Sequence, residues 1–357
     1  MTSHDIARSR LSNQRIASSP CRTPAEVVAA LGAMQAQDYL GGLWSVGVRL
    51  PGTTEAAVEE AIAGRRIIRT WPMRGTLHFV AAQDVRWMLE LLTPRIIAGS
   101  ARRWRLLELE EAVFARSRKL FIRALEGDGQ LTRDAMMELL ERDGISTAGL
   151  RGYHILWRLA QEGLLCFAAR EGKQHAFALL EKWAPQARSL DRDQALAELA
   201  RRYFTGHGPA TLHDFAWWSG LKVADAKAGL DSVRSELCSE TVADSDYWTG
   251  RNAPALPNSR TAYLLPGFDE FLLGYTDRSA TLDAQHRTKV LLIANGRFLG
   301  TIVIDGRVAG TWKRDLKKKE VVVTTTAFRA LKAGERRLVE AAADNYGRFL
   351  QMPVSFV

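Results

Sequence analysis

An order of predicted elements that recurs three times along the 357 residues is the strongest constraint on the fold. Each recurrence consists of three predicted helices followed by two short β runs that read as a hairpin. This order is typical of a winged helix. Apolar residues at helical spacing are common in many folds, so one occurrence would say little, but three in series predict a tandem array.

The second repeat is the clearest of the three. Thr132 stands where it can cap the middle helix, and Gly163 stands where the third helix should stop. A hairpin with the basic-tipped turn Arg170–Lys173 follows. The predicted elements are Glu111–Leu125, Arg133–Glu141, Gly149–Glu162, Leu164–Ala168 and Gln174–Leu180.

The other two repeats follow the same order, and the first is the more divergent. In the third repeat, Thr211 is placed to cap the middle helix. The predicted elements of the third repeat are Arg192–Phe204, Leu212–Ser219, Val223–Glu236, Leu237–Val242 and Tyr247–Thr249. Those of the first are Pro24–Ala33, Tyr39–Arg49, Thr54–Ala63, Ile67–Thr70 and Thr76–Val80.

Beyond about Pro254 the pattern changes to an antiparallel meander. The two-residue turns Asn295-Gly296 and Asp305-Gly306 favour tight hairpins, because both central positions need a positive φ. The predicted strands are Thr261–Leu265, Lys289–Ala294, Arg297–Ile304, Arg307–Lys313, Glu320–Thr326 and Val354–Val357, with one helix over Phe328–Phe349. We expect an α+β chain with winged helices at residues 1–105, 106–188 and 189–255 and a β domain at 256–357.

The charge of the chain favours a polyanionic partner. Lys and Arg number 49 against 40 Asp and Glu, which gives a net charge of +9. Neutralising phosphates with such residues releases counterions and drives binding to nucleic acid. The alternative is a set of solvated faces on an arginine-rich protein. No apolar stretch is long enough to span a membrane and no export signal precedes the first repeat, so we expect a cytoplasmic protein.

Two glutamines between the first two predicted helices are candidates for chemistry, although their spacing alone favours a structural role. In an extended segment, residues two apart point the same way, so Gln35 and Gln37 would present both amides to one pocket. In a helix they would point apart. The alternative is a polar pair that satisfies backbone groups at a helix junction.

Other polar residues carry weaker signals. Asp38 adjoins the glutamines, and His78 alternates with apolar neighbours in a predicted strand. The pair Asp269-Glu270 invites a catalytic interpretation, but helix capping or a salt bridge to an arginine explains it more simply. His207 and His213 form no metal-binding motif, and no metal or cofactor is expected.

Four segments resemble the AlkZ-type family of winged-helix DNA glycosylases, which includes bacterial enzymes that unhook interstrand crosslinks. They are MQAQDYLGGLWSVGVRL, RGTLHFV, GPATLHDFAWWSGL and PGFDEFLLGYTDR, and the similarity extends along the whole chain. The family's catalytic Gln-apolar-Gln signature matches Gln35-Ala36-Gln37. A sister group, the YcaQ type, has Asp at the second position, so this chain looks like the AlkZ side.

The resemblance implies three winged helices and a C-terminal β domain around a C-shaped basic cleft. It also implies a monofunctional glycosylase acting on N7-alkylated purines or crosslinks in double-stranded DNA. Gln35 and Gln37 would be catalytic, with Asp38 and His78 in support. The arginines and lysines expected to contact DNA are Arg65, Arg66, Arg69, Arg74, Arg297, Arg307, Lys313, Arg314 and Lys317.

Two hairpin tips are candidates for insertion into a DNA groove, because a hairpin of the family probes DNA in that way. They are Asn295-Gly296-Arg297 and Asp305-Gly306-Arg307, and for at least one of them an ordinary exposed turn is the better interpretation. The alternative function is a winged-helix regulator or lesion sensor that binds DNA without chemistry. A regulator usually dimerises on palindromic sites, whereas three fused units favour a monomer.

Overall fold

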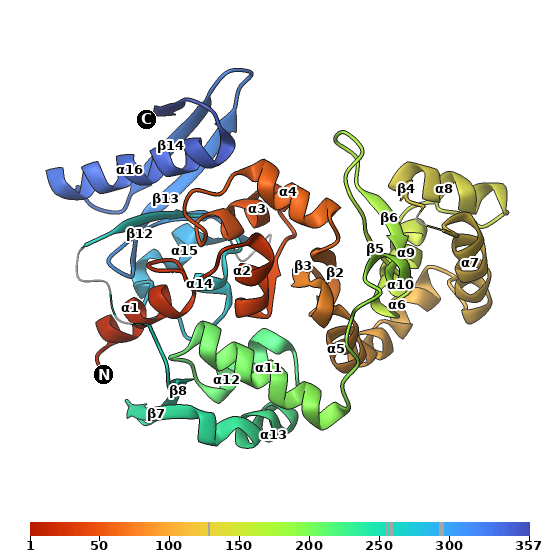
Figure 1. The fold of residues 1–357 in the computed structure, drawn as a ribbon, viewed down its shortest axis with the longest axis horizontal. Helices are drawn as coiled ribbons and strands as arrows, with labels where there is room; N and C mark the ends of the chain where they lie inside the picture. Colours follow the sequence, from red (N-terminus) through yellow and green to blue (C-terminus); the bar gives the residue numbers. More distant parts are fainter. Residues whose placement is uncertain (128, 255, 257–259, 293–295) are drawn as a thin grey trace. The chain divides into compact units, whose positions relative to one another are not determined.

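The structure is a computed structural model that describes residues 1–127, 129–254, 256, 260–292 and 296–357 (Figure 1). Helices alternate with largely antiparallel strands, so the fold is of the α+β class, as the sequence predicted. Two compact units are present: Met1–Val58 with Leu196–Val357, the first unit, and Glu59–Ala195, the second unit. In the part of the chain described, no helix is both long and apolar enough to cross a membrane.

The second unit has a sheet whose strands follow the order β3-β2-β5-β6-β4. These strands are β2 (Ile67–Met73), β3 (Thr76–Ala81), β4 (Leu131–Thr132), β5 (Leu165–Phe167) and β6 (Ala176–Leu179). The helices of the unit are α5 (Val85–Gly99), α6 (Ala101–Leu106), α7 (Glu111–Ala124), α8 (Arg133–Arg142), α9 (Arg151–Gln161) and α10 (Leu180–Trp183). The helices and hairpin of the predicted second repeat are confirmed to within one or two residues, and Thr132 caps α8.

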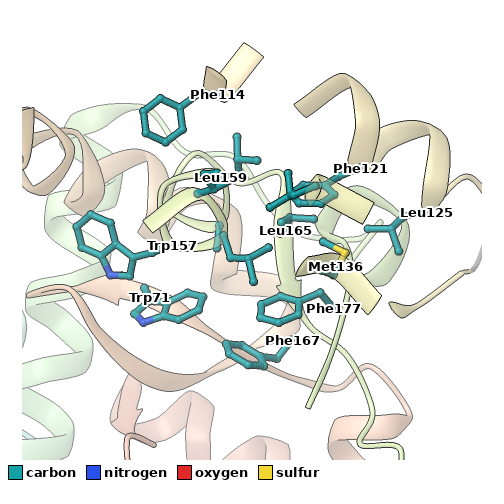
Figure 2. Packing of buried hydrophobic residues seen from close by; sticks show 14 of the residues in the cluster. Trp71, Phe114, Phe121, Leu125, Met136, Trp157, Leu159, Leu165, Phe167 and Phe177 are labelled. Atoms are coloured by element: carbon teal, nitrogen blue, oxygen red, sulfur yellow. The ribbon is translucent and has the colours of Figure 1, made fainter. Parts of the chain in front are cut away.

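Aromatic residues form the core of the second unit. Trp71 of β2 packs against Phe167 of β5 with ring centroids 5.0 Å apart, and Trp157 of α9 lies 6.3 Å from Trp104. Figure 2 shows Trp71, Phe167 and Phe177 gathered beneath the helices that carry Leu159 and Phe121. Each large apolar side chain buried here contributes roughly 1.5–3 kcal/mol to folding. This core fixes the second repeat as a stable unit.

Helices from the N-terminal part of the chain and from residues 192–233 belong to the first unit. They are α1 (Ser3–Asn13), α2 (Pro24–Leu31), α3 (Tyr39–Gly47), α11 (Arg192–His207), α12 (Leu212–Ser219) and α13 (Val223–Val233). The short strand β1 (Ala33–Gln35) follows α2, α4 (Glu55–Ala63) follows α3, and the hairpin β7 (Leu237–Val242) and β8 (Ser245–Gly250) follows α13. Thr211 caps α12 as predicted, in a reciprocal capping box with Asp214.

Helix α11 continues three residues beyond the predicted end at Phe204. Gly206 does not stop the helix. A Cβ on Gly206 would lie 2.7 Å from the carbonyl oxygen of Ala30, so the glycine permits close packing against α2. The prediction placed the end too early because a glycine near a helix terminus reads as a stop signal.

A five-stranded sheet of the first unit has the order β15-β14-β13-β12-β9. Its strands are β9 (Ala262–Leu265), β12 (Gly300–Ile304), β13 (Arg307–Leu316), β14 (Val321–Ala327) and β15 (Val354–Phe356), and only β14 and β15 pair in parallel. Figure 1 shows α16 (Ala333–Leu350) running alongside this sheet. Tyr346 of α16 lies between Trp44 of α3 and Trp312 of β13, at centroid distances of 5.0 and 5.2 Å.

Two predicted strands of this region are wrong in part. The run Lys289–Ala294 begins as helix α15 (Arg287–Val290) and continues as the two-residue strand β10 (Leu291–Leu292), with its last two residues outside the described part. The run Arg297–Ile304 is interrupted at Leu299, because β11 (Arg297–Phe298) pairs with β10 whereas β12 pairs with β9. A short apolar run does not reveal which sheet its residues join.

The turn Asp305-Gly306 is confirmed as a tight hairpin: φ is +50° at Asp305 and +85° at Gly306, and Ile304 pairs with Arg307. The turn predicted at Asn295-Gly296 falls partly outside the described residues.

The predicted helix Phe328–Phe349 begins instead at Ala333, because the amide of Phe328 still bonds to the carbonyl of Ala309. Helices α1, α5 and α6 were not predicted.

Candidate active site

The two candidate glutamines lie on a short strand and the bend that follows it, between α2 and α3. Gly32, with a φ of +77°, ends α2 and turns the chain into β1, whose last residue is Gln35. Gln37 and Asp38 follow in a bend before α3 begins at Tyr39. The motif is therefore not helical, as the sequence hypothesis required, and its further requirement, that both amides face one pocket, stays a prediction.

The two glutamines differ in their surroundings. Gln35 is buried, with 8% of its surface exposed, whereas Gln37 is exposed. The backbone N–H of Gln35 donates to Oε1 of Glu270 at 2.9 Å. Its side-chain oxygen, also buried, has no hydrogen-bond partner among the residues that the structure describes. A buried acceptor without a hydrogen bond lowers the free energy of unfolding by about 1–3 kcal/mol, so such a group calls for an explanation, and a catalytic role is one.

Glu270, which holds the backbone of Gln35, is fully buried at the start of α14 (Glu270–Leu273). Its second oxygen accepts from the indole N–H of Trp218 at 2.8 Å, and Nε2 of His207 lies 3.5 Å from the same atom. The ring of His207 also stacks on Tyr203 at a centroid distance of 4.8 Å. Sequence reasoning did not connect Glu270 with the glutamines, because 235 residues separate it from Gln35.

Asp269, the neighbour of Glu270, fixes helix α3. Its two oxygens accept from the two terminal nitrogens of buried Arg49 at 2.7 and 2.8 Å. They also accept from the Ser45 hydroxyl and from the backbone N–H of Phe271, the first-turn bond that caps α14. The simpler interpretation of this carboxylate, capping and a salt bridge, is thus confirmed, although the arginine is distant in sequence.

Gln14 connects the Arg49–Asp269 ion pair to the backbone of Glu270. Its amide N–H₂ donates to the carbonyl oxygen of Glu270, and its amide oxygen accepts from Arg49 at 2.9 Å. We call Gln14, Arg49, Asp269 and Glu270 the buried polar cluster. A fully bonded network in a low-dielectric interior is rigid, so the backbone at Gln35 is held firmly.

An open pocket of about 240 Å³ adjoins the glutamine motif, and Asp38 lines it. We call it the Asp38 pocket. Arg314 of β13 reaches Oδ2 of Asp38 at 3.2 Å, and the adjacent Lys313 is exposed at the pocket. Gly267, Phe298 and Trp312 form apolar parts of the lining. The pocket therefore combines two cations with one carboxylate next to Gln37.

The predicted DNA-contacting residues of the first unit divide into two groups. Lys313 and Arg314 line the Asp38 pocket, and Lys317 is exposed at the turn between β13 and β14. Lys317 lies 3.8 Å from Glu320, and Arg307 is ion-paired with Asp283 on a turn that packs against α1. The side chain of Arg297 lies outside the described part of the structure.

The turn Asp305-Gly306, expected as a candidate for groove insertion, is packed against α1. A Cβ on Gly306 would lie 3.0 Å from Ala7, and the Asp305 carboxylate lies 3.3 Å from Arg8 and 3.4 Å from His4. Insertion would require these contacts to break. The expectation for this hairpin is therefore corrected: a helix that the sequence did not predict covers the tip.

In the second unit, Arg66 is exposed and Arg74 occupies the tight turn between β2 and β3, with a φ of +52°. Arg65 is half-buried and lies over the Trp183 ring at 4.6 Å. These three arginines remain candidates for DNA contact.

Arg69 does not fit the expected role, because it is only 4% exposed. Its guanidinium lies over the Phe167 ring at 4.7 Å and 3.1 Å from Nε2 of His175. Burial, followed by the charge of Arg69, lowers the pKa of His175 to about 4, so the imidazole is neutral and can accept a hydrogen bond. Arg69 thus serves packing within the second unit.

His78 is buried on β3, where Nδ1 lies 2.9 Å from the carbonyl oxygen of Thr76 and Nε2 lies 3.5 Å from Arg74. The contact with Thr76 runs along the same strand. A supporting role for His78 in catalysis stays a prediction.

The comparisons relate the chain to known DNA glycosylases. A family model described as "DNA glycosylase AlkZ-like" matches residues 28–349. An interstrand DNA cross-link repair glycosylase from Streptomyces sahachiroi is 29% identical over 326 residues, covering 84% of each chain. The solved structure of the Streptomyces sahachiroi DNA glycosylase AlkZ superposes with a TM-score of 0.80 at 23% identity and covers all of both chains. The last comparison shows a common fold.

Proposed function

The chain belongs to the AlkZ-like DNA glycosylase family, and from this premise we propose that it hydrolyses the N-glycosidic bond of N7-alkylated purines in double-stranded DNA. The proposed activity includes the unhooking of interstrand crosslinks that are attached to N7-alkylated purines. The name of the Streptomyces relative, an interstrand DNA cross-link repair glycosylase, supports this extension.

The observation that carries the proposal is the amide oxygen of Gln35. It is buried without a hydrogen-bond partner in the described residues, while the backbone of the same residue is anchored on Glu270. The bond to Glu270 fixes the backbone of Gln35, and the proposal is that the unpartnered side-chain oxygen meets the reacting group once DNA is bound. Gln37, exposed two residues later, supplies the second amide.

The chemistry suits two neutral side chains. An N7-alkylated purine already carries a positive charge and leaves as a neutral base, so no general acid is needed. The bond between C1′ and the base nitrogen breaks, the sugar develops oxocarbenium character, and a water oxygen adds to C1′ and loses its proton to solvent. The two amides orient that water and place carbonyl dipoles near the developing positive charge. An abasic site remains.

An amide is not a general base at neutral pH, so this mechanism favours activated lesions over normal bases. No lysine is proposed as a Schiff-base nucleophile, and the proposed enzyme is monofunctional and needs no cofactor. Asp38 has a supporting role: its carboxylate in the pocket lining offsets part of the charge of Arg314 at 3.2 Å.

For DNA binding we propose a monomer of three winged helices and a β domain, with boundaries near residues 105, 188 and 255. The proposed cation set omits the buried Arg69, and also Arg307, whose turn packs on α1. The residues that remain are Arg65, Arg66, Arg74, Lys313, Arg314 and Lys317. The side chain of Arg297, outside the described part, stays a prediction.

A lesion-panel excision assay tests the proposal. The purified protein is incubated with duplexes that carry 7-methylguanine or a nitrogen-mustard crosslink, and released base and abasic sites are measured. We expect release from both, and a loss of about 10²–10³ in the single-turnover rate for Gln35→Ala or Gln37→Ala, the magnitude typical of one lost electrostatic contact.

Two outcomes would contradict the proposal. If both alanine variants excise at the wild-type rate, the glutamines are not catalytic. If the wild-type protein binds DNA but releases nothing from the panel, the non-catalytic regulator or lesion sensor gains support. Thermal melting of each variant provides the folding control.

A further inference from the structure

A second basic pocket lies in the first unit, on the segment that joins α14 to α15. It has a volume of about 130 Å³, and Thr276, Asp277, Arg278, Ser279 and Arg287 supply its polar lining. A water molecule occupies roughly 30 Å³ in the liquid, so the pocket has room for a polyatomic anion. None of these residues belongs to the proposed catalytic or DNA-contacting sets.

The two arginines of this pocket have no carboxylate partner in the described part of the chain. Arg278 donates from Nε to the carbonyl oxygen of Leu272 at 2.6 Å and from a terminal nitrogen to that of Thr276 at 3.3 Å. Arg287, at the start of α15, is exposed and forms no ion pair in that part. A guanidinium has five N–H groups, so Arg278 retains three for a ligand.

The nearby acid and hydroxyl groups are already engaged. Both oxygens of Asp277 accept from Ser279, one from its backbone N–H at 2.9 Å and one from its hydroxyl at 3.0 Å. The hydroxyl of Thr276 donates to Asp214 at 2.7 Å. The pocket's available donors are therefore guanidinium groups, which favours an anion over a cation or a neutral polar ligand.

The positions of the two cations are unfavourable without a ligand. Burial, followed by the charge of Arg287, lowers the pKa of Arg278 to about 10. Arg278 remains protonated near pH 7, so a partly buried positive charge is maintained beside another positive charge. An anion between the two guanidinium groups would relieve this repulsion.

Two aromatic rings hold the Arg278 guanidinium in place. Its central carbon lies 5.1 Å from the Trp217 ring centroid and 5.5 Å from that of Phe298. Phe298 also lines the Asp38 pocket. One aromatic side chain thus contacts both Arg278 and the pocket beside the glutamines.

We propose that Arg278 and Arg287 form a binding site for a phosphodiester of DNA, separated by Phe298 from the pocket that adjoins Gln37. The site would hold a backbone phosphate near the damaged nucleotide while the glutamines act on the sugar. The inference rests on the proposed function only in taking DNA as the source of the phosphate.

The test is the salt dependence of binding to an undamaged duplex, which needs no excision. Each phosphate neutralised contributes about 0.9 to the slope of log K against log salt concentration. We expect Arg287→Gln to reduce the magnitude of this slope by about 1, and Arg287→Glu to reduce affinity further. Lys227→Gln is the matched control, because it removes one exposed charge that is already paired with Asp231.

Methylphosphonate substitution locates the phosphate. Neutral linkages are introduced one at a time into the duplex, and each is measured with the wild-type protein and with Arg287→Gln. One linkage should weaken wild-type binding and have no further effect in the variant. Equal salt slopes for the wild type and both Arg287 variants, or no linkage that couples to Arg287, would overturn the inference.

A titration with inorganic phosphate distinguishes a DNA phosphodiester from a free phosphate as the bound anion. Binding of inorganic phosphate that Arg287→Gln abolishes, together with an unchanged slope for DNA, would overturn the phosphodiester assignment in favour of a free anion. If the wild type excises no lesion but the slopes differ as expected, the proposed function fails and the phosphate site stands.

Discussion

The buried polar cluster and the Asp38 pocket both adjoin the glutamine motif, but they use charge in different ways. In the cluster, Arg49 and Asp269 are buried and every oxygen of the carboxylate accepts a hydrogen bond. In the Asp38 pocket, Lys313 is exposed and Arg314 meets a half-exposed carboxylate. The buried charges of the cluster fix the geometry of the site, whereas the exposed charges of the Asp38 pocket are available to a ligand. Substitutions in the cluster should therefore change stability or catalysis, and those in the pocket should change DNA binding.

The largest expected effect is on stability, from Asp269→Ala. The substitution leaves the Arg49 guanidinium buried without its partner, which typically costs 3–5 kcal/mol. Urea unfolding measures the loss. The double variant Arg49→Met with Asp269→Ala removes the uncompensated charge and should recover part of it. A single variant as stable as the wild type would contradict the structural role of the cluster.

The next effect is on catalysis, from Glu270→Gln. An amide offers one acceptor where the carboxylate serves two donors, the N–H of Gln35 and the indole of Trp218. We expect the single-turnover excision rate to fall about ten- to a hundredfold while DNA affinity is unchanged, because a displaced catalytic group slows the chemical step.

A second substitution separates positioning by Glu270 from simple damage to the fold. Adding Trp218→Phe to Glu270→Gln removes the competing donor, so the amide carbonyl can accept from Gln35. The excision rate should then recover in part, although the buried tryptophan has been truncated. A further decline in rate instead would show that Glu270 acts through stability alone.

A smaller effect is expected in the Asp38 pocket, on DNA binding. Lys313→Gln should weaken binding similarly for all DNA sequences and lower the salt slope by about 1. Arg314→Gln should have the smaller effect of the two, because Asp38 offsets its charge at 3.2 Å. Fluorescence anisotropy over a range of salt concentrations measures both, and a flat wild-type response would remove this region from the DNA-binding surface.

The smallest effects are expected at the two hairpin tips of the five-stranded sheet. Replacing Lys317, Lys318 and Lys319 with Gln together should lower affinity for undamaged DNA modestly, because all three are exposed. Arg307→Gln should leave affinity unchanged, since Arg307 is paired with Asp283 and its turn packs on α1. A stronger effect from Arg307 than from the lysines would reverse our assignment of the two tips.

The amino-acid sequence alone determined the caps and turns that depend on only a few neighbouring residues. Thr132 and Thr211 cap their helices as predicted, and Asp305-Gly306 forms its tight turn, because capping and positive φ are properties of the immediate backbone. The position of Gln35-Ala36-Gln37 between two helices was predicted in the same way, whereas its catalytic assignment came from the family resemblance.

Tertiary structure decided which charged residues are available. Arg69 and Arg66 stand three positions apart in one basic run, but β2 carries Arg69 into the aromatic core and leaves Arg66 at the surface. Glu270 reaches Gln35 across 235 residues, and no periodicity encodes such a contact. Local patterns depend on hydrogen bonds within a turn or two, whereas the partner of a buried charge depends on where the whole chain places it.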